Sequence, residues 1–139
     1  MQTKEQLVSG VSLFASFSAD ELKEAVRLMD EIDVDAGRVL IEEGRTGGEC
    51  FVVVDGRVEV RRDGQRIDEA GPGEVLGELA LLDKKPRNAS AVAIEPTRLL
   101  VMAPAEFNTL LNHHPNVRAK VEAAASAHRA SAERRSEGS

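Results

Sequence analysis

The sequence predicts a mainly β fold with helices at both ends, and three observations lead to this prediction. Apolar residues between Ile32 and Met102 come in short runs separated by turn residues. Two Asp-Gly dipeptides, Asp55-Gly56 and Asp63-Gly64, stand between such runs and are strong hairpin signals. Apolar residues at helical spacing are confined to the two ends of the chain. Short strands at regular spacing favour an antiparallel β-sandwich or barrel.

The predicted strands follow from these runs. They cover residues 32–34, 39–41, 50–54, 57–61, a return strand around 66–67, 91–94 and 98–102. The loop 43–48 is rich in glycine, but it lacks the lysine and Ser/Thr of a P-loop, so we interpret it as a turn between strands.

The helices are indicated by their end signals. A short helix is expected over residues 3–9. Ser18 and Glu21 form a capping-box pattern at the start of a helix that runs to about residue 29. Pro104 suits the first turn of a helix that ends before Pro115, and Pro115 starts a last, alanine-rich helix to about residue 134.

Composition limits the classes of function. The chain has 139 residues, 42% hydrophobic and 30% charged, which is ordinary for one globular domain. A net charge of −6 argues against a general surface for nucleic acid or for an acidic membrane. Aromatic residues make up 3%, with no Trp or Tyr, so stacking platforms for single strands are not expected. We therefore predict neither a nucleic-acid partner nor a membrane partner.

The expected location is the cytoplasm. No apolar run approaches the roughly 18 residues that a transmembrane helix needs. Residues 7–17 are apolar but interrupted by serine, and an acidic helix follows, so we interpret them as part of the fold and not as a signal peptide. Cys50 is the single cysteine, which fits a reducing compartment.

The stretch from Val75 to Val92 carries the chemistry. Gly77 allows backbone angles closed to other residues and close approach of a ligand. The short helix that follows leaves N–H groups for an anion in its first turn, before the polar turn Asp83-Lys84-Lys85-Pro86. Arg87 supplies a permanently charged fork, and the Glu78 carboxylate can accept a hydrogen bond from a hydroxyl. One anion together with one hydroxyl fits a sugar phosphate.

This stretch resembles a known family. The runs Gly77-Glu78-Leu79-Ala80-Leu81-Leu82 and Pro86-Arg87-Asn88-Ala89-Ser90 look like the phosphate-binding cassette of cyclic nucleotide-binding domains. That family includes protein kinase A regulatory subunits, cyclic nucleotide-gated channels and the catabolite activator type of transcription factor. The resemblance extends from about Leu13 to about His114. It implies an eight-stranded antiparallel β-roll of the double-stranded β-helix or jelly-roll type, with an N-terminal helix, a short cassette helix and two C-terminal helices.

The resemblance also implies roles for single residues. In the family the arginine pairs with the cyclic phosphate and the glutamate holds the ribose 2′-hydroxyl, which points to Arg87 and Glu78 here. Threonine at the position of Asn88 is associated in the family with guanine; Asn has donors and acceptors, so cAMP and cGMP both stay open. The candidate ligand-binding residues are Gly77, Glu78, Leu79, Ala80, Arg87, Asn88, Ala89 and Ser90.

We therefore expect a non-catalytic sensor that binds cAMP or cGMP and passes the signal through its C-terminal helices. No cofactor besides this ligand is expected. No metal is expected either, because all three histidines lie outside the β region and no ligand set accompanies them. Two alternatives stay open: a ligand-independent interaction or dimerisation module that kept the fold, and a small β-barrel enzyme that turns the nucleotide over.

The expected organisation has four parts. Residues 1–12 form an N-terminal segment, 13–115 the binding domain, 116–135 a C-terminal lid helix and 136–139 a disordered tail. Two partners for the lid stay open: a second copy of the chain, or an effector domain on another chain. The apolar stripe on the last helix is too narrow to predict a stable coiled coil. It comprises Val117, Val121, Ala124 and Ala125.

Overall fold

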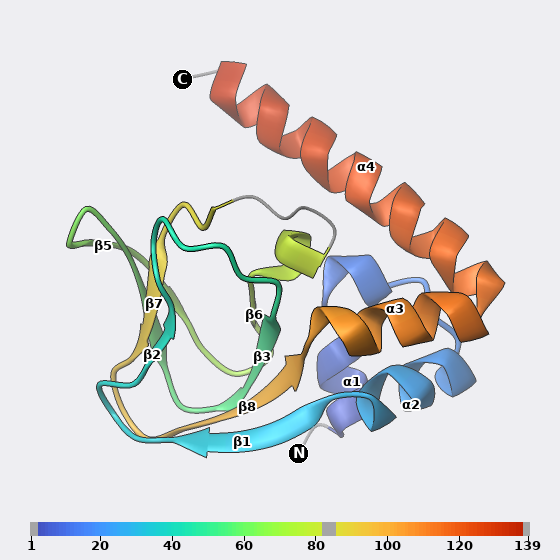
Figure 1. The fold of residues 1–139 in the computed structure, drawn as a ribbon, viewed down its shortest axis with the longest axis horizontal. Coiled ribbons are helices and arrows are strands. Elements are labelled where there is room, and N and C mark those ends of the chain that lie inside the picture. Colours follow the sequence, from blue (N-terminus) through green and yellow to red (C-terminus); the bar gives the residue numbers. More distant parts are fainter. Residues whose placement is uncertain (1–2, 82–85, 138–139) are drawn as a thin grey trace.

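A computed structural model of the chain describes residues 3–81 and 86–137. Two four-stranded antiparallel sheets face each other as a roll, and the helices gather at one end of it (Figure 1). The strand orders are β1-β8-β3-β6 and β2-β7-β4-β5. The predicted mainly β class and β-roll are confirmed.

The strands of the described residues are β1 (Asp30–Val34), β2 (Val39–Ile41), β3 (Cys50–Asp55), β4 (Val58–Arg62), β5 (Gln65–Ala70), β6 (Val75–Leu76), β7 (Ser90–Ala93) and β8 (Thr97–Met102). The α-helices are α1 (Lys4–Ser9), α2 (Ala19–Arg27), α3 (Pro104–His113) and α4 (Pro115–Glu137). Two short 3-10 helices complete the fold, η1 (Ser12–Phe14) and η2 (Glu78–Leu81). Strand β6 is not among the strands that the apolar runs predict.

The N-terminal helices begin as the sequence predicts. Ser18 accepts a hydrogen bond from the Glu21 backbone N–H at 3.2 Å, and the Glu21 carboxylate accepts from the Ser18 N–H at 2.8 Å. Thr3 and Gln6 form a second capping box at the start of α1. Each box satisfies N–H groups that the first helical turn leaves without partners.

One predicted hairpin is wrong and the other is confirmed. Asp63-Gly64 joins the paired strands β4 and β5, and both residues have positive φ (54° and 79°), as a type I′ turn requires. Asp55-Gly56, in contrast, joins β3 to β4, which belong to different sheets. It is a corner at which the chain crosses from one sheet to the other, and the segment 94–96 makes the same crossing between β7 and β8.

The apolar core has two parts, one on each side of β3 and β8. Val52, Leu100 and Met102 face the helical layer and join its buried residues. Phe51, Val53 and Leu99 face the inside of the roll. Both faces of these strands are therefore covered, which explains why the sequence of β3 is continuously apolar and does not alternate.

Helix α4 leaves the helical layer as an extended rod (Figure 1). Its first turns are held by Val117 and Val121, which are buried with the residues of η1 and α2. The helix continues to Glu137, two residues beyond the expected end of the lid at 135 and into the expected tail. Residues 138 and 139 of that tail lie outside the described part of the chain.

Candidate functional site

Gly77 stands at a sharp turn between β6 and η2. Its φ is +73°, a backbone conformation that side chains disfavour. A Cβ at this position would collide with Nη1 of Arg87 and would lie 3.0 Å from the carbonyl oxygen of Glu49. The missing side chain therefore lets the cassette backbone approach the guanidinium closely, and the two predicted site residues are brought together.

The backbone of Arg87 is held by the glycine-rich loop. Its N–H donates to the carbonyl of Arg45 at 2.9 Å, and its own carbonyl accepts from the N–H of Gly44 at 2.8 Å. The side chain is only 10% exposed, and Nη2 donates to the carbonyl oxygen of Glu49 at 2.7 Å. The Glu49 carboxylate lies at 4.0 Å, a long ion pair. The guanidinium is thus oriented mainly by backbone and keeps other donors for an anion.

Burial dominates the electrostatics of this region. It lowers the pKa of Arg87, while Glu49 and Cys50 oppose the shift. Cys50 is buried beneath the site, and burial, with a contribution from Glu78, raises the pKa of its thiol to about 12. This thiol is protonated at neutral pH, so the side chain acts as a small buried hydrophobe.

Glu78 is the first residue of η2 and is 7% exposed. The hydroxyl of Ser12, on η1, donates to its Oε1 at 2.5 Å. The carboxylate therefore joins the cassette to the N-terminal helical layer by a hydrogen bond. A buried carboxylate that accepts from a hydroxyl is chemically able to accept from the hydroxyl of a ligand.

The other predicted residues occupy different positions. Leu79 and Ala80 follow Glu78 in η2, which is a single 3-10 turn and therefore has a smaller dipole than an α-helix. Asn88 is exposed and its carbonyl accepts from Nε of Arg62 at 3.0 Å. The hydroxyl of Ser90 accepts from the backbone N–H of Glu43 at 3.0 Å. Ala89 is half-buried beside them. Asp83, Lys84 and Lys85 of the predicted polar turn lie outside the described residues.

Three residues of this site have no sequence pattern that predicts their position there. Gly47 and Glu49 lie against the Arg87 guanidinium, and Ser12 contacts Glu78. The sequence indicates only a turn for the loop that carries Gly47. In the fold this loop also forms hydrogen bonds with the backbone and the side chain of Arg87. The lack of a lysine rules out a P-loop, but the glycines themselves are the available signal for a close approach.

A hollow of about 200 Å³ opens beside Arg87. Strand β2 and the loop that follows it form its walls, together with Gly47 and Glu49. The buried guanidinium therefore borders a space, and a small anion has a route to it.

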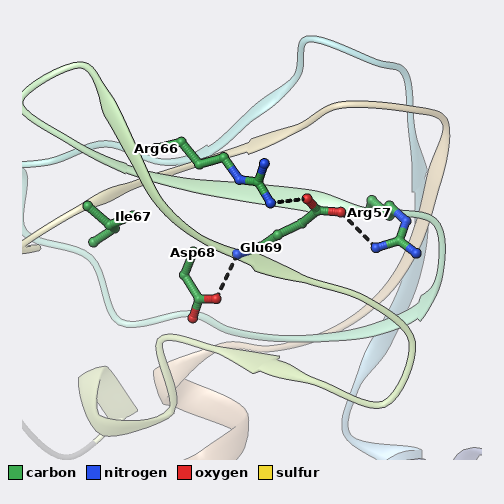
Figure 2. Close-up of a pocket in the computed structure, with 5 residues that line it drawn as sticks. All are labelled: Arg57, Arg66, Ile67, Asp68 and Glu69. Carbon is green, nitrogen blue, oxygen red and sulfur yellow. Dashed lines mark hydrogen bonds and ion pairs between the residues drawn. The ribbon is translucent and has the colours of Figure 1, made fainter.

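A larger hollow, of about 640 Å³, lies on the surface of β5 and beside Arg57, the residue before β4 (Figure 2). Figure 2 shows the Glu69 carboxylate between two arginines, with Arg57 Nη1 at 2.7 Å and Arg66 Nη2 at 2.5 Å. Both arginines are more than half exposed. We interpret this hollow as a solvated surface network and not as the site, because its charges neutralise one another.

The described residues contain no group of three or more His, Cys, Asp or Glu side chains that could hold a metal ion. His113 and His114 lie at the end of α3, away from the strands. Within the same part of the chain, no helix is long and apolar enough to cross a bilayer.

An arginine side chain largely buried against a glycine turn, at the edge of a β-roll capped by helices, is the arrangement of a domain that can hold an anionic ligand. The chain belongs to the cyclic nucleotide-binding domain family, whose model matches residues 31–114.

Curated and solved proteins support this membership. The chain is 34% identical over 112 residues to a cyclic nucleotide-gated potassium channel of Rhizobium etli, covering 81% of the chain and 31% of the channel. It superposes with a TM-score of 0.84 and 28% identity on the N-terminal domain of a transcriptional regulator from Streptomyces coelicolor, covering 91% and 92% of the two chains. The regulatory domain of Toxoplasma gondii PKA with cAMP gives a TM-score of 0.71 and 29% identity, covering 77% and 42%. The chain spans about three tenths of the length of the first curated relatives.

Proposed function

We propose that this chain is a non-catalytic sensor that binds cAMP or cGMP at the cassette, with the cyclic phosphate on Arg87. The observation that carries the proposal is the approach of the Gly77 backbone to the guanidinium of Arg87, whose side chain is 10% exposed. Burying a permanent charge is unfavourable unless a partner compensates it. The backbone carbonyl of Glu49 and its carboxylate at 4.0 Å compensate it only in part here, so a bound anion would improve its environment.

Backbone N–H groups around Leu79, Ala80 and Ala89 are the proposed second set of phosphate donors. The carboxylate of Glu78 is the proposed acceptor for the ribose 2′-hydroxyl. Asn88 and Ser90, at the rim, complete the proposed contacts. The similar regulatory domain of Toxoplasma gondii PKA forms a co-crystal with cAMP, which supports the same class of ligand for this chain.

The proposed signal leaves through the C-terminal helices. We take residues 13–115 as the binding unit, 1–12 as an N-terminal segment, 116–135 as the lid and 136–139 as a tail. Ligand can move α4 only if it contacts one arrangement of the cassette more strongly than another. A second copy of the chain or an effector domain would receive that motion. The cytoplasm is the proposed location.

Paired titrations of cAMP and cGMP, each followed by a thermal melt, test this function. A ligand that binds the native state must raise the melting temperature, by an amount that grows with its concentration. We expect saturable binding of one or both nucleotides, and their ratio gives the preference. If neither nucleotide binds or stabilises the protein, the chain is an interaction module that kept the fold. AMP appearing during incubation with cAMP would instead identify an enzyme.

A further inference from the structure

Ser12 brings a hydroxyl to the cassette from the N-terminal end of the chain. It is 66 residues from Glu78 in sequence, yet its Oγ donates to Glu78 Oε1 at 2.5 Å. The residues on either side, Val11 and Leu13, are 0% exposed, so the apolar core fixes the backbone that carries this hydroxyl. The donor is therefore held rigidly while its side chain reaches out of the core.

We propose that Ser12 is a positioning residue for recognition of the ribose hydroxyl, an inference that rests on the proposed function. Two carboxylate oxygens offer about four acceptor sites, so Glu78 can accept from Ser12 and from a ligand hydroxyl together. A hydrogen bond to one oxygen fixes the plane of the carboxylate before the ligand arrives. Ordering the glutamate side chain then no longer opposes binding.

The same contact ties the site to α4. Helix η1, which begins with Ser12, packs against α4, and a hollow between them is lined by Ser12, Ala15, Ala119 and Ala123. A ligand hydroxyl on Glu78 therefore acts on a carboxylate that is hydrogen-bonded to the element on which α4 packs. If the ligand favours one position of η1, that position in turn raises the affinity for the ligand, because the coupling between two sites is reciprocal.

The test compares cAMP with 2′-deoxy-cAMP, which lacks the hydroxyl proposed for Glu78. Calorimetry on the full chain measures both ligands with wild type, Ser12→Ala, Ser12→Thr and Ser16→Ala. We expect Ser12→Ala to weaken cAMP about three- to tenfold and to leave 2′-deoxy-cAMP unchanged, since the lost hydrogen bond involves a charged group. Ser12→Thr keeps the hydroxyl and should restore cAMP affinity. Ser16, an exposed serine just beyond η1, is the matched control, and its variant should bind both ligands as wild type does.

Two results would overturn the inference while leaving the proposed function intact. Ser12→Ala changing both affinities equally would show a general structural role, and tighter cAMP binding would show that Ser12 competes with the ligand. Failure of wild type to bind both cAMP and cGMP in the paired titrations would refute the proposed function itself; if only cGMP binds, the same variants are compared with cGMP and 2′-deoxy-cGMP. If Ser12→Ala lowers the melting temperature too far for calorimetry, Ser12→Cys replaces it. Cysteine is similar in size to serine and donates only weakly, so we expect the same selective weakening of cAMP binding.

Discussion

At the scale of single residues, the site depends on the close approach of Gly77 to Arg87. Two separate properties of glycine matter there: the positive φ of +73° and the space that a Cβ would take from the guanidinium. The positive φ affects the stability of the fold, and the space left by the missing Cβ affects the affinity for the ligand. A matched control separates them, because Gly64 has a φ of +79° with nothing within 4 Å of its virtual Cβ.

We expect Gly77→Ala to weaken nucleotide binding by at least about tenfold, because the methyl group displaces the Arg87 side chain and a charge-assisted contact is lost. Gly64→Ala should leave affinity unchanged. Both variants should lose roughly 1 kcal/mol of stability from the strained backbone. Calorimetry and urea unfolding measure the two effects. Equal affinity of both variants would show that the approach of Gly77 to Arg87 is irrelevant to binding.

Residues of the candidate site can be proposed from the sequence where the motif is local. Gly77, Glu78 and Arg87 lie within one short stretch, and their residue types suffice to indicate an anion and a hydroxyl. Ser12 and Glu49 were not predictable, because they reach the site across 66 and 38 residues. Only the folded chain brings them there, since neither has a sequence pattern of its own.

At the scale of elements, the two Asp-Gly dipeptides show that a local sequence signal predicts a turn but not which strands pair. Both turn the chain, yet only Asp63-Gly64 closes a hairpin. At Asp55-Gly56 the glycine alone has positive φ, and a Cβ there would collide with Thr97. The dipeptide predicts that the chain turns, but the choice of strand partner depends on the opposite corner of the roll, which lies about 40 residues away in sequence.

Thr97 joins these two corners and is 3% exposed. Its hydroxyl accepts from the Arg57 N–H at 3.2 Å and donates to the Glu95 carbonyl, 2.8 Å away. We expect Thr97→Val to destabilise the fold by about 1–3 kcal/mol, because the Arg57 N–H, which makes a part-buried hydrogen bond, loses its acceptor. Thermal unfolding measures the loss. Thr109→Val, which removes a hydroxyl that donates an exposed hydrogen bond to the Ala105 carbonyl on α3, is the control, and a similar loss in both variants would contradict the role of the corner.

At the scale of the whole molecule, one ion pair fastens α4 to the N-terminal helices. Nζ of Lys120 lies 2.5 Å from Oε1 of Glu21, and this hydrogen bond is the main cause that lowers the Glu21 pKa from its ordinary 4.5. A lowered carboxyl pKa stabilises the fold above the ordinary value, and the stabilisation is lost as the pH falls through the lowered value. The ion pair therefore holds α4 in place at neutral pH.

We expect Lys120→Met to lower the free energy of unfolding by about 0.5–1 kcal/mol at neutral pH, as partly exposed pairs do. The difference from wild type should shrink as the pH falls below 4.5 and through the lowered pKa of Glu21, because a protonated carboxyl no longer pairs with Lys120. Urea unfolding at neutral pH and at a series of acidic pH values measures this. Lys23→Met removes the same charge from an exposed position on α2, and the prediction fails if it has the same pH-dependent effect.

The architecture was largely predictable because hydrophobic periodicity, capping boxes and prolines are local properties. The path of α4 was not, since its narrow apolar stripe specifies only that Val117 and Val121 are buried. The proposed movement of α4 depends on the ligand that binds at the cassette, and therefore on Arg87.

The affinity of Arg87→Ala for its cyclic nucleotide tests the central claim most directly. Loss of a charge-assisted contact of roughly 1.5–3 kcal/mol should weaken binding by about one to two decades. The melting temperature of the free protein should change little, because removing a buried charge also removes its desolvation cost. Arg27→Ala, which changes an exposed arginine on α2, should bind as wild type does. Unchanged affinity in a folded Arg87→Ala variant would contradict the account.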